Sequence, residues 1–481
     1  MKDNERYDAV VIGSGPNGLA AAITLLKAGK RVLIIEAKDS IGGGMRTGEL
    51  TLPGFRHDIC SAIHPLAVGS PFFRSLPLMD FGLKWIFPPA ALAHPMDNGQ
   101  TALLLNSVTE TAGTLPGDTE NYIRLIKPVL SKWNLILPEV LAPFHIPRHP
   151  FALLRFALHG VMSASRLAER KFSSQLARGF FAGLSAHSML RLEEPVTAAF
   201  ALVLALLGHS FGWPFPEGGS GNLALALEGY IKSLGGEFLL NTPIESMADI
   251  PPGKVLLFDL TPRQILHIAG NSLPRGYRRQ IEGYRYGPGV FKMDFALKSP
   301  VPFNSPQCAL AATVHLGGTM EEIALSENEV FQGRHPEKPF VMLAQQSLFD
   351  STRAPLEKHT LWAYCHVPNG SEIDISERII SQIERFAPGF RQTILSVHKM
   401  TCPDFQDYNG NYIGGDINGG IQDLRQLFTR PYFSLTPCRT PLKGVYICSS
   451  STPPGGGVHG MCGFYAARAA LKDIYGIKIK L

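Results

Sequence analysis

The stretch Tyr7-Asp-Ala-Val-Val-Ile12-Gly13-Ser-Gly-Pro-Asn-Gly18 decides the fold of this chain. Its first six residues are mostly apolar and β-branched, which predicts a strand, and a glycine-rich turn follows without a gap. Residues 19–28 have the composition of a helix, and a second β-branched run at 31–35 ends in Glu36. Strand, glycine turn, helix, strand and acid in this order predict a βαβ unit that binds a dinucleotide.

Each glycine of the first turn has its own physical task. Gly13 makes the tight turn, Gly15 lets the backbone approach a diphosphate, and Gly18 lets the helix pack closely on the strands. The start of the helix then faces the phosphates with free N–H groups and its positive dipole end. Glu36 suits a ribose hydroxyl and would repel the 2′-phosphate of NADP. The predicted contacts in this segment are Gly13, Gly15, Pro16, Asn17, Gly18 and Glu36.

A second glycine-rich turn, Ala37-Lys-Asp-Ser-Ile-Gly-Gly-Gly-Met-Arg-Thr47, follows the acid directly. Flavoproteins commonly carry such a turn with an arginine that reaches the diphosphate or ribose, whereas nicotinamide dehydrogenases usually continue without it. FAD is therefore the expected cofactor. A flexible loop with a solvated Arg46 is the alternative interpretation. The further predicted contacts are Ala37, Gly43, Gly44, Met45 and Arg46.

The C-terminal region repeats this pattern of strand, glycine-rich turn and helix. Residues 444–449 predict a strand, residues 450–463 are nearly all Ser, Thr, Pro and Gly, and residues 464–475 predict a helix. Such a turn places many backbone N–H groups near one anion or ring edge. Taken alone, the segment also fits a purely structural loop.

Together these segments resemble the phytoene desaturase-like flavoproteins, within the wider amine-oxidase and desaturase superfamily. Within that family the chain most resembles the branch of pyridine nucleotide-disulfide oxidoreductase domain-containing protein 2, although no cysteine pair supports the "disulfide" in that name. The resemblance covers nearly the whole chain, and it implies FAD contacts in the C-terminal turn. The family often has arginine where this chain has Gly44, which puts the contact of Arg46 in doubt. The contacts that the resemblance adds are Ile244, Gly456, Gly457, Val458 and His459.

The resemblance also implies an α/β fold in which a discontinuous Rossmann-type FAD-binding domain carries an α+β substrate domain of the amine-oxidase and phytoene-desaturase type. A chain of 481 residues agrees with more than one domain. The expected FAD-binding domain comprises residues 1–70, 217–270 and 430–481. The expected substrate domain comprises residues 71–216 and 271–429, with a basic apolar helical insertion near 145–216.

By the same resemblance, the chain is expected to be an FAD-dependent oxidoreductase that desaturates, saturates or isomerises a hydrophobic, isoprenoid- or lipid-like substrate. A flavin amine oxidase-like enzyme and a non-catalytic FAD-binding interaction or regulatory protein stay open as alternatives. Because the flavin itself takes the hydride, catalytic side chains need leave no motif. The catalytic residues are therefore not identified, and His64 and His459 are weak candidates beside a structural role. Other visible candidates are His57, Asp58, His209 and Asp416.

A second glycine pattern, Gly219-Ser-Gly-Asn-Leu-Ala224, also fits a dinucleotide turn. It follows Phe215-Pro-Glu instead of a strand, and no acid closes a second strand after it. We interpret it as a tight helix entry and expect no second dinucleotide site. No arrangement of metal ligands, paired carboxylates or a Ser-His-Asp triad is evident either, so no metal is expected.

Charge and composition limit the partners. The net charge of +5 is carried by residues 145–180, which hold six basic residues and one acid. We expect no nucleic-acid binding, because neither a broad basic face nor a reading module is visible. The segment is also apolar, and one stripe of its predicted helix carries Phe151, Leu154, Leu158 and Val161. This pattern predicts core helices with a solvated basic face. Peripheral contact with an anionic membrane is the alternative interpretation. The electron acceptor is not predicted.

Seven scattered cysteines, none spaced as C-x-x-C, favour a reducing compartment. Residues 1–8 are charged where a signal peptide needs an apolar stretch, and the apolar run at 196–208 is too short to cross a bilayer. The expected location is cytoplasmic, with membrane association left open.

Overall fold

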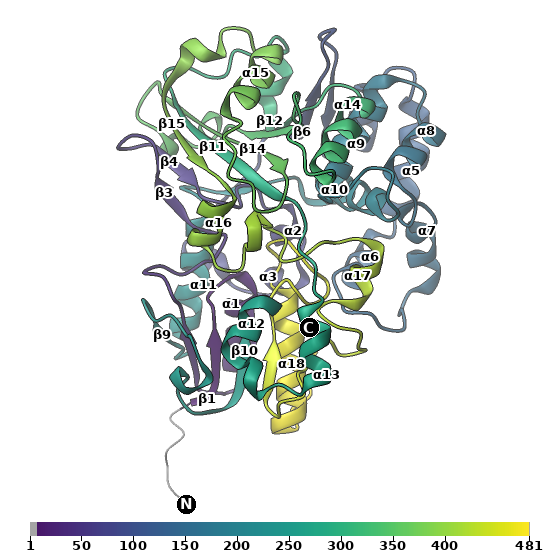
Figure 1. The fold of residues 1–481 in the computed structure, drawn as a ribbon. Coiled ribbons are helices and arrows are strands. Elements are labelled where there is room, and N and C mark those ends of the chain that lie inside the picture. The colour runs from purple at the N-terminus through teal and green to yellow at the C-terminus, as the bar shows by residue number, and fades with distance from the viewer. Residues whose placement is uncertain (1–6, 481) are drawn as a thin grey trace, which may run out of the picture.

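Two β-sheets organise the chain, and the computed structural model describes residues 7–480 (Figure 1). The first sheet has five strands, all parallel, in the order β16-β10-β1-β2-β9. Their bounds are β1 Tyr7–Ile12, β2 Val32–Ile35, β9 Glu237–Leu239, β10 Gly253–Phe258 and β16 Val445–Ile447. Strands from the beginning, middle and end of the chain thus share one sheet, which confirms the discontinuous Rossmann-type fold. The charged residues before Tyr7 that argue against a signal peptide lie outside the described residues.

Helices α1 (Pro16–Lys27) and α18 (Met461–Tyr475) pack against each other beside this sheet. The approach is so close that a Cβ on Gly463 would collide with the backbone oxygen of Asn17. This contact also corrects the predicted start of the last helix. The turn ends at Gly460, which is left-handed (φ +69°), and residues 461–463 are helical because small Gly463 fits against α1.

The second sheet has seven strands in the order β15-β11-β14-β13-β12-β6-β7. Only β12 and β6 pair in parallel, so this sheet is mixed and of the α+β type. Its bounds are β6 Ala90–Pro95, β7 Thr101–Leu104, β11 Gly289–Leu297, β12 Ala311–Leu316, β13 Val341–Ala344, β14 His359–Val367 and β15 Ile394–Met400. Short two-stranded pairs are formed by β3 Thr47–Glu49 with β4 Arg56–Asp58, and by β5 Trp85–Ile86 with β8 Phe215–Pro216.

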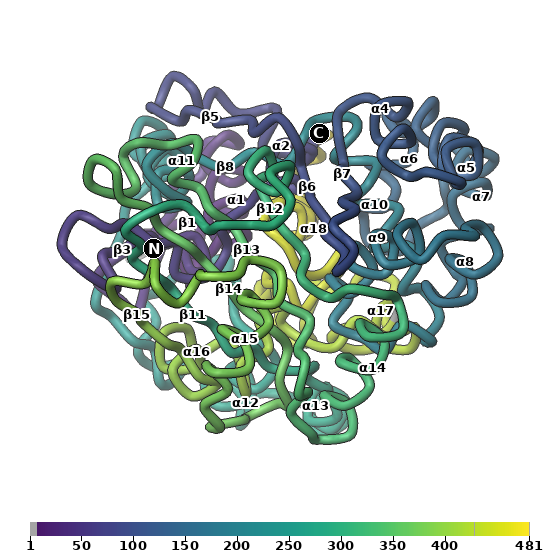
Figure 2. Tube along the Cα trace, turned by 90° about the horizontal axis from the view of Figure 1, so that it is seen from above, coloured from purple at the N-terminus to yellow at the C-terminus, as the bar shows by residue number. Residues whose placement is uncertain are grey.

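The basic apolar segment forms four helices on one side of the molecule (Figure 2). They are α7 Pro150–Gly160, α8 Ala164–Lys171, α9 Gln175–Ala186 and α10 Thr197–Phe211. The interpretation of the apolar stripe as core is wrong for α7. Phe151 is 88% exposed and Leu158 61% exposed, because α7 turns Phe156 inward instead. Across the described chain, no helix is both long and apolar enough to span a bilayer.

The remaining helices connect and cover these layers. They are α2 Pro65–Gly69, α3 Pro71–Arg74, α4 Val108–Gly113, α5 Thr119–Leu130, α6 Trp133–Val140, α11 Gly221–Ser233, α12 Pro262–Ala269, α13 Arg275–Glu282, α14 Met320–Phe331, α15 Ser376–Phe386, α16 Cys402–Tyr408 and α17 Leu424–Thr429. Of these, α11 packs on α1, and α14 packs on α9.

Candidate functional site

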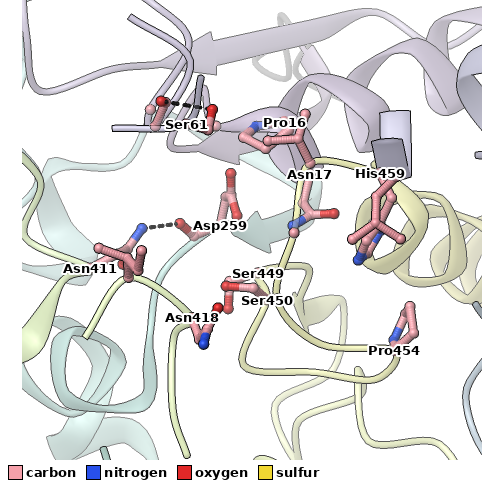
Figure 3. A pocket seen from close by; sticks show the side chains of 18 of the residues that line it. Pro16, Asn17, Ser61, Asp259, Asn411, Asn418, Ser449, Ser450, Pro454 and His459 are labelled. Carbon is pink, nitrogen blue, oxygen red and sulfur yellow. Dashed lines mark hydrogen bonds between the residues drawn. The ribbon is translucent and has the colours of Figure 1, made fainter. Parts of the chain in front are cut away.

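A cavity of about 1070 Å³ follows the carboxyl ends of the five parallel strands (Figure 3). Ligands of open α/β sheets bind at this edge, because the turns after parallel strands meet there. Ligand pockets usually hold about 300–1,000 Å³, so this cavity is at the upper end of that range and suits a large ligand such as a dinucleotide.

The strand order fixes how the predicted residues are arranged along the cavity. Glu36 follows β2 and Ile244 follows β9, so both lie toward one edge of the sheet. Gly15 follows the central strand β1. Asp259 follows β10 and Ser449 follows β16, toward the other edge. Segments from four regions of the sequence therefore line one elongated site, with the phosphate-binding turn in its middle.

Fourteen of the sixteen residues proposed to contact the cofactor line this cavity. They are Gly13, Gly15, Pro16, Asn17, Glu36, Ala37, Gly43, Gly44, Arg46, Ile244, Gly456, Gly457, Val458 and His459. Gly18 and Met45 lie behind the lining. Met45 is fully buried in the core, and Gly18 supports the turn, since a Cβ there would collide with the carbonyl oxygen of Gly13.

Glu36 is held by a dense set of partners. One carboxylate oxygen accepts hydrogen bonds from the backbone N and the Oγ of Ser14, at 3.0 and 2.5 Å. The other oxygen lies 3.2 Å from a guanidinium nitrogen of Arg46 and accepts from the N of Lys38 at 3.0 Å. Arg46 also donates to the carbonyl oxygen of Ser40 at 2.6 Å. The acid and the arginine therefore form one anchored group at the edge of the cavity.

The structure explains why this chain has glycine where the family often has arginine. A side chain on Gly44 would collide with the hydroxyl of Tyr412, which occupies that space. The neighbouring Tyr408 donates to the carbonyl oxygen of Gly43 at 2.6 Å, and its ring lies 5.4 Å from the Arg46 guanidinium. Two tyrosines from a distant segment thus shape the second glycine turn.

Both histidine candidates line the cavity and are buried. The Nε2 of His64 lies 2.8 Å from the hydroxyl of Ser220, while its Nδ1 has no partner. The Nδ1 of His459 accepts from the N of Met461 at 3.0 Å, and its Nε2 lies 3.1 Å from the carbonyl oxygen of Gly455. Burial lowers the pKa of each ring to about 4, so both are neutral at physiological pH. Both ring nitrogens of His459 therefore have hydrogen-bond partners within its own loop, whereas Nδ1 of His64 has none.

The other candidates lie outside the cavity lining. Asp58 accepts from Arg353 at 2.8 Å, and His57 lies 3.6 Å from Asp294. His209 pairs with the Tyr122 hydroxyl. Asp416 accepts backbone N–H groups of Gly287, Asn418 and Gly420. These contacts give each group a place in the packing of the chain. No group of three potential metal ligands occurs within residues 7–480.

The second glycine pattern follows the short strand β8 (Phe215–Pro216), so the expectation that no strand precedes it is wrong. The pattern enters α11 and does not line the cavity. The N of Ser220 donates to Asp58 at 2.7 Å, and the N of Gly221 donates to Thr47 at 2.9 Å. These donors are used by protein side chains, and a Cβ on Gly219 would collide with Thr47. The helix entry is therefore tight, as we interpreted it.

Sequence reasoning missed several cavity residues. Asp259 lies at the centre of Figure 3, with its side chain directed toward the helix that carries Pro16 and Asn17. Its position directly after an apolar run offered a signal, because carboxyl ends of parallel strands meet at one edge. Tyr408 and Tyr412 offered none, since only the fold brings them to the first turns.

The geometry of the turn fits a dinucleotide. A Cβ on Gly43 would lie 2.9 Å from the Cα of Gly15, so two glycine turns face each other across a cradle that side chains would fill. Both glycines line the cavity at the start of α1, where free N–H groups favour an anion. Together with the strand order, this defines a Rossmann-type site for a dinucleotide.

Comparisons with known proteins confirm the resemblance and, together with this site, show an FAD-dependent oxidoreductase with the amine-oxidase and phytoene-desaturase fold. The chain is similar to pyridine nucleotide-disulfide oxidoreductase domain-containing protein 2 of Rattus norvegicus, with 25% identity over 97% of this chain and 94% of that protein. It is also similar to the lycopene-forming phytoene desaturase of Pseudescherichia vulneris, with 26% identity over 96% and 98%. The NAD(P)-binding Rossmann-like domain matches residues 11–75. Cyclohexylamine oxidase from Brevibacterium oxydans shares the fold, with a TM-score of 0.59 and 16% identity over 98% of each chain.

Proposed function

We propose that this flavoenzyme desaturates, saturates or isomerises a hydrophobic substrate of isoprenoid or lipid type. The observation that carries the proposal is the apolar part of the cavity. Helices α7 and α10, the loops after α6 and α10, and strands β13 and β14 supply its walls. They contribute Leu141, Phe156, Phe200, Val203, Leu204, Trp213, Met342 and Trp362.

The ionisable groups near these walls are neutral or already paired. Burial lowers the pKa of His187 to about 3, and its ring lies 2.9 Å from that of His315. Glu139 accepts from the N of Arg148 at 3.0 Å and pairs with His145 at 2.5 Å. An unpaired charge on a substrate would find no partner here, so an apolar chain fits better. When bound, FAD supplies a two-electron hydride acceptor, and these walls hold the substrate and exclude water.

An amine is the alternative class of substrate for this site. A protonated amine needs a free carboxylate or facing aromatic rings. The rings of Trp362 and Tyr364 line the cavity but meet edge to face, with centroids 4.9 Å apart at 73°. The cation of Lys292 already lies 5.9 Å from the Trp362 ring. The site therefore favours the apolar substrate.

Anaerobic mixing of the purified holoprotein with candidate substrates tests this proposal. We expect bleaching of the flavin absorbance by reduced isoprenoids or lipids in micelles, or reoxidation of photoreduced flavin by polyenes. Primary amines are expected to react poorly because the apolar walls offer them no free partner. NADH and NADPH are expected to react poorly because residues 7–480 show one dinucleotide-binding unit, whose acid fits FAD. Reduction by amines alone would overturn the substrate class. Rapid, saturable bleaching by NADPH would overturn the expected electron flow.

We further propose that the substrate enters from an anionic membrane. The cavity reaches the surface at Ile146 and Val161, which line it and are 92% and 57% exposed. Phe151 on α7 is 88% exposed, and Phe433, in a loop whose Ser434 lines the cavity, is 81% exposed. Such a rim beside basic side chains is typical of proteins that rest in a lipid interface.

Co-sedimentation with vesicles of phosphatidylserine and phosphatidylcholine tests the membrane contact. Burying each large apolar side chain contributes roughly 1.5–3 kcal/mol. The variant Ile146→Ser/Phe151→Ser/Phe433→Ser should therefore stay in the supernatant at any salt concentration. Changing Arg166, Arg170 and Lys171 to Gln should weaken binding mainly at low salt. The control Met79→Ser/Leu356→Ser, two equally exposed sites outside the rim, should bind like wild type. Absence of the wild-type protein from the pellet would contradict the proposal.

A further inference from the structure

Asp259 places a carboxyl group inside the phosphate-binding turn. It directly follows β10, and its N donates to the carbonyl oxygen of Ile12 at 2.8 Å. Its Oδ2 accepts the N–H of Gly18 at 2.9 Å. A Cβ on Gly15 would lie 2.6 Å from the same oxygen. The carboxyl group is thus fixed against both glycines from the side of the sheet, and it lines the cavity.

This position matters because two anions would share one helix end. The start of α1 favours a negative group through its dipole and its free N–H groups. In this structure the N–H of Gly18 already donates a hydrogen bond to the carboxyl group of Asp259. A diphosphate bound at this helix start would add a second negative group there, and no basic side chain offsets the charge of Asp259. Two like charges at such a distance disfavour each other, and protonation of the carboxyl group removes the conflict.

We infer that Asp259 binds a proton when FAD binds, so that the affinity for the cofactor depends on pH. The inference rests on the assignment of FAD to this cavity, and it does not depend on which substrate is used. The protonated group still accepts from Gly18 with one oxygen, and its O–H becomes a donor near the phosphates. Asp259 is accordingly a binding residue that makes cofactor loading sensitive to pH.

The surroundings of Asp259 support this role. Burial raises its pKa to about 7; the Gly18 hydrogen bond opposes the rise, and Glu36 at the end of β2 adds to it. Cys448 after β16 and Cys462 on α18 are the other ionisable neighbours, and burial raises the pKa of both thiols, which keeps them neutral. No basic side chain contributes to the shift at Asp259. A bound diphosphate adds negative charge, so it raises this pKa further.

The direction of the pH dependence follows from the difference in the pKa of Asp259 between the free protein and the FAD complex. Below about pH 7 the carboxyl group is protonated with or without FAD, and the Kd is constant. Above that pH the free protein is ionised while the complex keeps its proton. The Kd then rises by up to about tenfold per pH unit, until the pKa of the complex is reached.

Titration of the apoprotein with FAD between about pH 6 and about pH 9, followed by flavin fluorescence, tests the inference. Asp259→Asn keeps the shape and the acceptor for Gly18, so its Kd should not change with pH. The control Glu245→Gln removes another cavity-lining acid, which pairs with His267 at 2.9 Å, and should keep the wild-type slope. Calorimetry of the wild type in buffers of different ionisation enthalpy should show uptake of up to one proton per FAD near pH 8.

Three outcomes would overturn the inference. A wild-type Kd that is constant across this range, with no proton uptake, would show that Asp259 keeps one ionisation state. An unchanged slope in Asp259→Asn would assign the proton to another group. Failure of the wild type to bind FAD at any pH would refute the cofactor assignment itself, and a negative substrate screen alone would leave the inference intact.

Discussion

Replacing Gly15 with leucine is expected to abolish FAD binding while the protein stays folded. The backbone of Gly15 is extended (φ −66°, ψ 174°), so leucine is not strained there. Its side chain, however, would start 2.6 Å from Oδ2 of Asp259 and extend into the cradle expected to hold the diphosphate. We expect the Kd to rise at least about a thousandfold, which equals about 4 kcal/mol. Flavin absorbance after gel filtration and circular dichroism measure loading and folding separately.

The matched control is Gly113→Leu. Gly113 is the last residue of α4, its φ is not positive, and no atom lies within 4 Å of a Cβ built there. This variant should fold and bind FAD like wild type. Retention of full affinity in Gly15→Leu would place the diphosphate elsewhere, and loss of secondary structure in it would shift the test to the smaller substitution Gly15→Ala.

The dinucleotide-binding unit could be predicted because its signals are local. Strand β1 coincides with the predicted run at 7–12, and Glu36 lies directly after β2 as expected. Helix hydrogen bonds and the stiffness of β-branched residues act over a few residues, so the local sequence reports them. The parallel pairing of β1 with β2, which aligns these turns, also follows from the βαβ unit; the pairing of β1 with β10 was not predicted.

The cavity's other walls could not be predicted in this way. Tyr412 lies against Gly44 across a separation of several hundred residues, and nothing near either residue signals the contact. The apolar stripe of α7 shows a different limit. Periodicity reveals that a helix has an apolar face, but not whether that face meets the core or the mouth of a cavity. In α7, Phe151 and Leu158 face outward, and only Phe156 and Gly160 are buried.

The variant Arg353→Met is expected to destabilise the protein by about 3–5 kcal/mol. Arg353 is only 1% exposed and donates to Asp58 at 2.8 Å and to Asp350 at 3.1 Å. Asp58 in turn accepts the N of Ser220 at the start of α11, and Asp350 accepts the N of Gly218 at 2.7 Å. Removing the guanidinium leaves two buried carboxylates without a counter-ion, and both of them accept hydrogen bonds from the backbone just before α11.

The stabilisation by Arg353 depends on pH in a direction that the pKa of Asp58 determines. Burial alone would raise the pKa of Asp58, but Arg353 and the hydrogen bonds from Ser220 and Thr47 hold it below its usual value. A lowered pKa stabilises the folded state above the pKa of the unfolded chain, about 4, and the gain is lost as the pH falls through the folded value. The difference between wild type and Arg353→Met should therefore be full at pH 7 and shrink in acid.

Urea unfolding of the holoproteins at neutral and acidic pH measures this difference. The control Arg278→Met breaks the exposed pair of Arg278 with Glu282 on α13, where both side chains are nearly half exposed. Such i,i+4 pairs contribute about 0.3–0.5 kcal/mol, so the control should unfold almost like wild type. Equal, small losses in the two variants would show that water reaches the Asp58 carboxylate. A loss confined to Arg353→Met, and largest at neutral pH, identifies the buried guanidinium as the counter-ion that the carboxylates of Asp58 and Asp350 require.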